Sequence, residues 1–245
     1  MAIRKKPILK DESTSTNQPQ ISRKELINSV IKRKQKSKFL SDNQKDYYDI
    51  LINNQITICS GPAGVGKSYI SMKAAVDLLM DPNNSYEKII IVRPAVEAEE
   101  KLGSLPGNLE EKLDPYIFPS YYLLNKIIGK EAREKLKEYE VIEVFALAYM
   151  RGMNIDNSIL IFEEGQNATP NQMKMLLTRI GEGSRMVVTG DLAQADRLND
   201  NGLINFCNLL GGKQVLKHVD IVQFNAKDIE RHNAVKEVLA LYGDS

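Results

Sequence analysis

The sequence predicts an α/β fold in which a mainly parallel sheet lies between layers of helices. Short runs rich in Ile, Val and Leu recur between residues 55 and 224, with room for a helix between successive runs. The runs are nearly continuous instead of alternating, which is typical of strands covered on both faces. The composition, 42% hydrophobic and 27% charged, is that of a globular domain. It excludes a collagen, a fully disordered chain and a disulfide mini-protein.

Six β-branched runs are the expected strands: QITICS (55–60), KIIIVR (88–93), VIEVF (141–145), SILIF (158–162), RMVVTG (185–190) and HVDIVQF (218–224). Helices fit the stretches that remain, at 69–80, in pieces between 108 and 140, and at 170–180, 201–210 and 228–242. The sequence shows no internal repeat and no second domain-sized segment. We therefore expect one domain over residues 39–245, preceded by a flexible basic arm over residues 1–38.

The arm concentrates positive charge. Residues 1–38 carry 11 Lys or Arg against three acids, which leaves the rest of the chain with a net charge of −7. The first twenty residues are polar and are expected to be disordered, because burying them would not offset the entropy lost. Residues 21–38 can form a basic helix with an apolar seam of Leu26, Ile27, Val30 and Ile31. This helix is either a solvated arm or an electrostatic contact for nucleic acid.

Nothing in the sequence predicts export or a membrane partner. The N-terminus lacks the apolar core of a signal peptide, and no run reaches the roughly 18 apolar residues of a membrane span. Cys59 and Cys207 lie in apolar surroundings without a CxxC or Cys/His cluster, and His218 and His232 are far apart. We expect a cytoplasmic protein, in the host cytoplasm if the source is a phage, without a zinc site.

A phosphate-binding loop follows the first expected strand. Residues 61–68, GPAGVGKS, match G-x-x-x-x-G-K-[ST] between a strand and a helix. Its glycines let backbone amides approach phosphate oxygens, and the helix adds its positive end. Lys67 should reach the β- and γ-phosphates of ATP, and the Ser68 hydroxyl should coordinate Mg²⁺. The motif predicts a three-layer P-loop NTPase core of the RecA-like kind. The expected nucleotide-binding residues are Gly61, Pro62, Ala63, Gly64, Val65, Gly66, Lys67, Ser68 and Tyr69.

Acidic and polar residues follow two further strands. Glu163 and Glu164 end strand 158–162, where two carboxylates are costly to crowd unless a cation such as Mg²⁺ is near. We expect Glu163 to hold the metal, directly or through water, and Glu164 to act as general base. The alternative is that one of them is only a solvated acid.

The strand 185–190 also ends in polar residues at the ligand-binding edge of the sheet. Thr189, Asp191 and Gln194 are candidates to sense the γ-phosphate, and the alternative is a simple turn at Gly190–Asp191. The sequence contains no Ser/His/Asp or Cys/His nucleophile set, so the chemistry would be that of the nucleotide.

Together these stretches resemble the PhoH family of ATPases, compact relatives of superfamily 1 helicases. The resemblance extends from Gln44 to Tyr242 and rests on residues 61–69, 92–116, 146–152, 163–191 and 228–242. It implies that Gln44 reads the adenine edge, with Tyr47 near the base. It also implies that Asp191 and Gln194, in a GDxxQ motif, couple the γ-phosphate to nucleic-acid movement.

The resemblance gives four arginines a role. Arg93 in VRPA and Arg151 in YMRG match positions near the nucleic-acid backbone, although Arg93 could instead cap its strand. Family members are similar in forming rings, commonly hexamers. Because no second core is expected in this chain, a neighbouring subunit should supply the arginine finger. Arg231 is the first candidate and Arg179 the second, and the alternative for Arg231 is an exposed helix residue.

One departure from the family concerns the acids. The family usually has Asp-Glu-Ala where this sequence has Glu163, Glu164 and Gly165. Magnesium demands near-octahedral geometry, so the longer Glu163 is expected to reduce turnover without abolishing it.

Three functions are compatible with the sequence. The leading hypothesis is an ATPase that works on RNA or single-stranded DNA. The second is a nucleotide-dependent assembly switch, which the acidic domain favours. The third, a small-molecule kinase, would need an acceptor pocket and lid for which the sequence has no signature.

Overall fold

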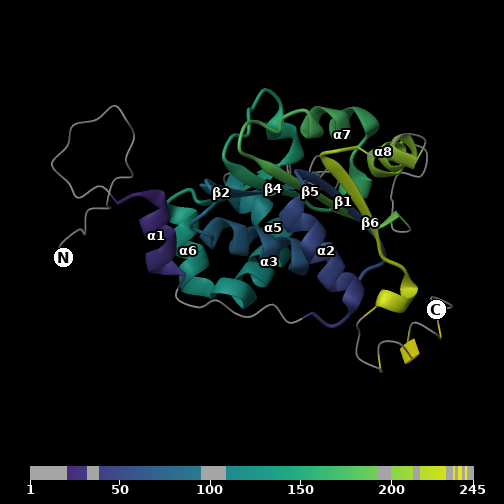
Figure 1. Ribbon diagram of the computed structural model, residues 1–245, viewed down its shortest axis with the longest axis horizontal. Coiled ribbons are helices and arrows are strands. Elements are labelled where there is room, and N and C mark those ends of the chain that lie inside the picture. The colour runs from purple at the N-terminus through teal and green to yellow at the C-terminus, as the bar shows by residue number, and fades with distance from the viewer. Residues whose placement is uncertain are drawn as a thin grey trace.

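The computed structural model describes residues 21–31, 39–94, 109–192, 200–211 and 216–229 and positions 234, 237, 238 and 241, with residues 109–116 described as backbone only. At its centre is a six-stranded sheet with the order β3-β2-β4-β5-β1-β6, in which every neighbouring pair is parallel (Figure 1). The strands are β1 (Ile56–Ser60), β2 (Lys88–Arg93), β3 (Ile142–Ala146), β4 (Ser158–Phe162), β5 (Arg185–Gly190) and β6 (Val219–Gln223).

Helices cover both faces of this sheet (Figure 1). One face carries α1 (Arg23–Val30), α2 (Asp42–Asn53), α3 (Lys67–Met80), α5 (Leu109–Ile128) and α6 (Lys130–Glu138). The other face carries α7 (Pro170–Leu177) and α8 (Gly202–Gly211). Three short 3-10 turns, η1 (Leu147–Met150), η2 (Gly165–Asn167) and η4 (Ala226–Asp228), complete the described elements. Buried Ile, Leu, Val and Met side chains form separate clusters under the two helical layers.

The predicted three-layer α/β fold is confirmed. Each of the six expected strands is present with its ends within one residue of the prediction. The helix predicted at 69–80 begins two residues earlier, because Gly66 has a positive φ of 92° and ends the phosphate loop immediately before Lys67. The helix predicted at 228–242 lies largely outside the described residues.

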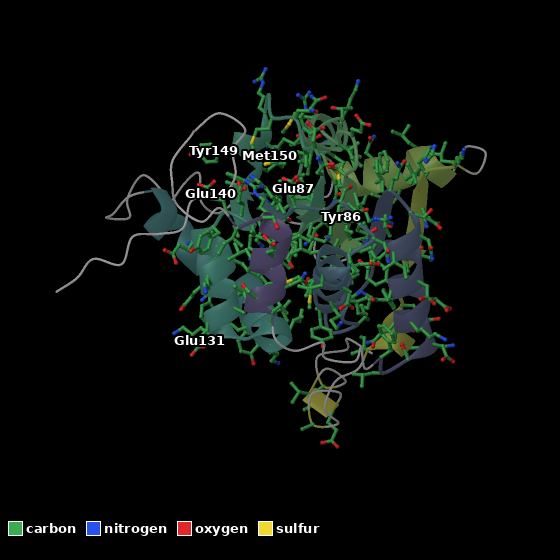
Figure 2. The ribbon with its side chains drawn as sticks, turned by 60° about the vertical axis from the view of Figure 1, so that its left-hand side comes forward. Tyr86, Glu87, Glu131, Glu140, Tyr149 and Met150 are labelled. Atoms are coloured by element: carbon green, nitrogen blue, oxygen red, sulfur yellow. The ribbon has the colours of Figure 1, made fainter. Side chains whose placement is uncertain are left out.

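The first helix differs from the flexible arm predicted for this stretch. Leu26 and Ile27 of α1 are buried in the core cluster that also contains residues of α3 and α6. Lys24 Nζ donates hydrogen bonds to three carbonyls at and beyond the end of α3, those of Leu79, Asp81 and Asn84, at 3.1, 2.7 and 2.9 Å. Arg23 pairs with Glu87, which Figure 2 places beside α1. The thin apolar seam and the polar contacts of Arg23 and Lys24 together dock residues 23–30 onto the domain.

The strand register brings the ligand-binding loops together at one edge of the sheet. Ser60 at the end of β1 is level with Gly190 at the end of β5, and Phe162 at the end of β4 is level with Val188. The loops that follow these three strands therefore converge, as expected at the carboxyl edge of an open parallel sheet. In the part of the chain that the structure describes, no helix is both long and apolar enough to cross a membrane.

Candidate functional site

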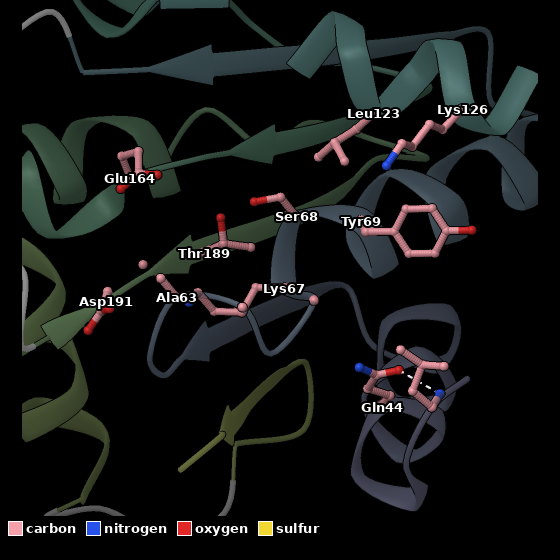
Figure 3. Close-up of a pocket in the computed structure, with 14 residues that line it drawn as sticks. Gln44, Ala63, Lys67, Ser68, Tyr69, Leu123, Lys126, Glu164, Thr189 and Asp191 are labelled. Atoms are coloured by element: carbon pink, nitrogen blue, oxygen red, sulfur yellow. Dashed lines mark hydrogen bonds between the residues drawn. The ribbon is translucent and has the colours of Figure 1, made fainter. Parts of the chain in front are cut away.

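A cleft of about 910 Å³ opens at this edge of the sheet, within the range of small-molecule sites (Figure 3). Glu164, Thr189 and Asp191 lie toward one end in Figure 3, and Gln44 and Tyr69 lie toward the other. Residues from α2, the phosphate loop, α3, α5 and the ends of β4 and β5 form its walls. The lining residues are Leu40, Gln44, Ala63, Gly64, Gly66, Lys67, Ser68, Tyr69, Leu123, Lys126, Glu164, Thr189, Gly190 and Asp191.

The phosphate loop depends on its glycines. Gly61, Gly64 and Gly66 have φ values of 152°, 93° and 92°, in a region that side chains with a Cβ rarely adopt. At Gly61 a Cβ would also lie 2.6 Å from the Cβ of Phe224, which follows β6. The loop can therefore keep this path only with glycine at Gly61, and β6 packs closely against it.

Lys67 lies over the loop that precedes it. Its Nζ donates hydrogen bonds to the carbonyls of Gly61 at 2.5 Å and Pro62 at 2.9 Å. Burial lowers the pKa of Lys67 below its ordinary value, whereas the nearby Cys59, Asp191 and Glu164 act in the opposite direction. The acids at the ends of β4 and β5 therefore share one electrostatic environment with the loop lysine.

Gln44 is buried where α2 meets the loop. Its Oε1 accepts a hydrogen bond from the Leu40 N–H at 2.8 Å, and its Nε2 donates to the Val65 carbonyl at 3.0 Å. The residue lines the cleft and at the same time holds the loop in place. Tyr47, one turn along α2, is fully buried and bonds to Ser71 at 2.7 Å, so the structure places it in the core and not along the cleft.

The two acids after β4 have different environments. Glu163 is buried, accepts a hydrogen bond from the Ser120 hydroxyl of α5 at 2.5 Å and does not line the cleft. Glu164 lines the cleft, and its side chain is 47% exposed. Arg93 spans the pair, with Nε 3.7 Å from Glu163 Oε2 and Nη2 3.6 Å from Glu164 Oε1. Arg93 is thus a counter-ion of both acids in this structure.

The turn after the acids contains Gln166, for which no role was predicted from the sequence. The buried Gln166 donates from Nε2 to Glu164 Oε2 at 2.7 Å and accepts from the Asp191 N–H at 3.1 Å. The unusual Gly165 precedes it, and a Cβ there would lie 2.9 Å from Val188 Cγ1. An alanine at this position would therefore require the Val188 side chain or the turn itself to shift slightly.

Helix α5 supplies further residues that sequence reasoning missed. Ser120, Leu123 and Lys126 are spaced three residues apart, so each is a neighbour of the next on the helix surface, and the last two line the cleft. Lys126 Nζ lies 4.6 Å from the centre of the Tyr122 ring. This spacing is visible in the sequence, but the sequence does not show which helix faces the phosphate loop.

The other predicted residues fall outside the cleft lining. Arg151 is exposed just after η1. Arg179 is partly buried, and its Nε donates to the Met175 carbonyl at 3.3 Å at the end of α7. Gln194 and Arg231 lie outside the described residues. Within the loop, Gly61, Pro62 and Val65 shape the backbone without lining the cleft.

The site offers oxygen ligands that suit Mg²⁺. Among the described residues, no three His, Cys, Asp or Glu side chains gather as a metal cluster. Magnesium bound with a nucleotide takes one or two protein oxygens and otherwise uses phosphates and water. Ser68 Oγ in the cleft and the Glu163 carboxylate behind it are oxygen donors of this kind, so the residues fit a magnesium–nucleotide complex.

Comparison with known proteins gives consistent matches over most of the chain. A family model described as "PhoH-like protein" matches residues 37–243. A PhoH-like protein of Bacillus subtilis is 42% identical over 202 residues, which are 81% of this chain and 61% of that protein. Protein PhoH of Escherichia coli is 32% identical over 237 residues, 95% of this chain and 66% of that protein.

The HK97 bacteriophage large terminase has a TM-score of 0.48 at 17% identity, over 90% of this chain and 47% of that chain. The chain spans about three fifths of the length of the PhoH-like relatives that it matches.

Proposed function

Because this chain belongs to the PhoH-like protein family, we propose that it binds ATP with Mg²⁺ in the cleft and hydrolyses the γ-phosphate bond. The observation that carries the proposal is the convergence of Lys67, Glu164 and Asp191 on one cleft at the carboxyl edge of the sheet. A phosphate-binding lysine, a candidate base and a γ-phosphate sensor are the parts that P-loop NTPases need.

The loop and its lysine bind the phosphates. Backbone amides of the loop and the start of α3 surround the phosphate oxygens. Lys67 exchanges its hydrogen bonds to the Gly61 and Pro62 carbonyls for bonds to the β- and γ-phosphates. Ser68 and Glu163 would hold Mg²⁺, which neutralises charge on the transferred group when it is bound. Glu163 is buried and does not line the cleft, so it would hold the metal from behind the cleft wall, directly or through water.

Glu164 accepts the proton of the attacking water. Its carboxylate is exposed in the cleft, whereas that of Glu163 is buried. Thr189, near the end of β5, and Asp191, directly after it, lie where they can contact the γ-phosphate or its water. At the other end of the cleft Gln44 contacts the adenine. Its bonds to Leu40 and Val65 use one lone pair of Oε1 and one hydrogen of Nε2, so the second lone pair and the second hydrogen contact the base.

Coupling to RNA or single-stranded DNA is the second part of the proposal. The exposed Arg151 and the basic residues of the N-terminal segment would contact backbone phosphates. Arg93 would contribute to the same surface only by leaving its two acids. Gln194, which follows β5 in the sequence, would couple the state of the γ-phosphate to movement of the bound nucleic acid.

A ring of subunits, commonly a hexamer in the family, would complete the site with an arginine from the neighbour. Arg231 is the first candidate and Arg179 the second. The test mixes Lys67→Ala subunits with Arg231→Ala subunits, each inactive alone. Recovered ATP hydrolysis in the mixture supports a finger that acts in trans, and no recovery contradicts it.

The proposed reaction itself is tested by phosphate release from ATP with Mg²⁺, with EDTA and with the Lys67→Ala variant. Hydrolysis should require both the metal and the lysine.

The acidic domain, with a net charge of −7 over residues 39–245, favours a second candidate, a nucleotide-dependent assembly switch. For a switch, the molar mass of the assembly measured by light scattering would change when ATP is added, and single-stranded RNA or DNA would have no effect on it.

A further inference from the structure

Gln166 connects the two strand ends that carry the proposed chemistry. Its side chain is 1% exposed and lies on η2, two residues after Glu164. One end of its amide donates to Glu164 Oε2 at 2.7 Å, and the other end accepts from the Asp191 N–H at 3.1 Å. A single buried amide therefore joins the end of β4 to the end of β5.

The backbone around this amide leaves space for it. A Cβ at Gly190 would lie 2.7 Å from Gln166 Oε1, closer than real Cβ contacts, so a larger residue would displace the amide. The Gly190 carbonyl accepts a hydrogen bond from the Gly61 N–H at 3.2 Å. The connection thus continues from Glu164 through Gln166 and β5 to the phosphate loop.

Glu164 needs a group that fixes its carboxylate. Its φ of 55° is unusual for a residue with a side chain, and the side chain is 47% exposed, so burial does not fix it. Arg93 Nη2 approaches Glu164 Oε1 only to 3.6 Å, which is longer than a hydrogen bond. The short bond from Gln166 sets the direction of the carboxylate. A general base must be aimed at its proton to within hydrogen-bond reach.

We propose that Gln166 is a positioning residue that aims the Glu164 carboxylate at the attacking water and links it to the position of Asp191. The inference rests on the proposed ATP hydrolysis and deepens it. A shift of Asp191 toward the γ-phosphate turns the shared amide and moves the carboxylate with it. Gln166 therefore makes the base responsive to the nucleotide.

Two substitutions separate the two ends of the amide. Gln166→Glu keeps the acceptor for the Asp191 N–H but loses the donor to Glu164, and Gln166→Met loses both. The matched control is Gln172→Met on α7, whose Oε1 accepts from the Thr169 N–H at 2.9 Å outside the cleft. Both changes at Gln166 should lower kcat about ten- to a hundredfold, as the loss of outer-shell partners does. The KM for ATP should change less than about twofold.

Hydrogen exchange at the Asp191 amide, followed by NMR, tests the second bond without any turnover. Gln166→Met should speed this exchange about tenfold, because a hydrogen bond contributes about 0.5–1.5 kcal/mol, whereas Gln166→Glu and Gln172→Met should leave it unchanged. Unchanged exchange in Gln166→Met, or a kcat equal to that of wild type in both variants, overturns the proposal. If the variants show the expected exchange pattern but the wild-type protein does not hydrolyse ATP, the proposed function is overturned and the hydrogen bond from the Asp191 amide to Gln166 stands.

Discussion

Replacing Arg93 with methionine should destabilise the fold through the buried Glu163. The side chain of Glu163 is 5% exposed and that of Arg93 20%, with Arg93 Nε 3.7 Å from Glu163 Oε2. Without the guanidinium, the Glu163 carboxylate keeps the Ser120 hydroxyl as a donor but loses its counter-charge. A buried carboxylate without a counter-charge is costly.

The distances set the expected size of this effect. Two unit charges about 4 Å apart attract by roughly 4 kcal/mol at an effective dielectric constant of about 20. Breaking a buried ion pair by removing one partner costs about 3–5 kcal/mol. Because the cleft beside Glu164 admits water, we expect Arg93→Met to lower the free energy of unfolding by about 2–3 kcal/mol. Glu163→Gln in the same protein removes the charge and keeps the acceptor for Ser120, so most of this loss should be recovered.

Urea denaturation of wild type, Arg93→Met, Glu163→Gln and the double variant gives the coupling energy. We expect at least about 1.5 kcal/mol, with unchanged m-values, since contacting groups couple by about 0.5–3 kcal/mol. Arg93→Lys is the control that retains the charge and should lose less than Arg93→Met. Additive effects within about 0.5 kcal/mol would refute the ion pair and favour Arg93 as a contact to the nucleic-acid backbone.

Other contacts predict further outcomes. Lys24→Met should lower the free energy of unfolding in urea by about 2 kcal/mol, because a charged donor to three carbonyls is lost. Lys45→Met, at an exposed position, is the control. Equal urea midpoints for the two variants would contradict the docking of α1 by Lys24. Gly61→Ala should weaken binding of a fluorescent ATP analogue at least about tenfold, because a Cβ there would lie 2.6 Å from the Phe224 Cβ and push the loop off its path, and overpacking costs about 1–3 kcal/mol. Gly152→Ala, at a positive φ of 84° with open space around it, should bind normally, and equal loss in both variants would contradict the role of the contact with Phe224.

The sheet could be predicted because its strands carry their own signal. Continuous Ile and Val runs such as residues 88–93 and 158–162 are buried on both faces, and their ends coincide with the observed strands. The phosphate loop was predictable because its motif includes the strand and helix that position it. Local sequence patterns were therefore enough to predict those elements whose structure depends on their own segment of the chain.

Contacts between distant segments could not be predicted in the same way. The apolar seam of α1 is thin, and its docking depends on Lys24 reaching carbonyls near the end of α3, 55 to 60 positions away. Gln166 and Ser120 acquire roles only when β5 and α5 are placed beside Glu164 and Glu163. Polar side chains of this kind have no periodicity that marks their partners.

Arg93 shows how one residue can support two interpretations. From the sequence we expected either a nucleic-acid contact or a strand cap, and the structure places Arg93 between two acids. The roles of Gln194 and Arg231 stay predictions, because both lie outside the described residues.

The most direct test of the account is ATP hydrolysis by the purified protein with and without single-stranded RNA and DNA, with Lys67→Ala as the blank. The account predicts magnesium-dependent turnover that rises when strands are added and is lost in Lys67→Ala. Turnover no higher than in the blank would contradict ATP hydrolysis in the cleft. Turnover that neither strand changes would contradict the coupling to nucleic acid.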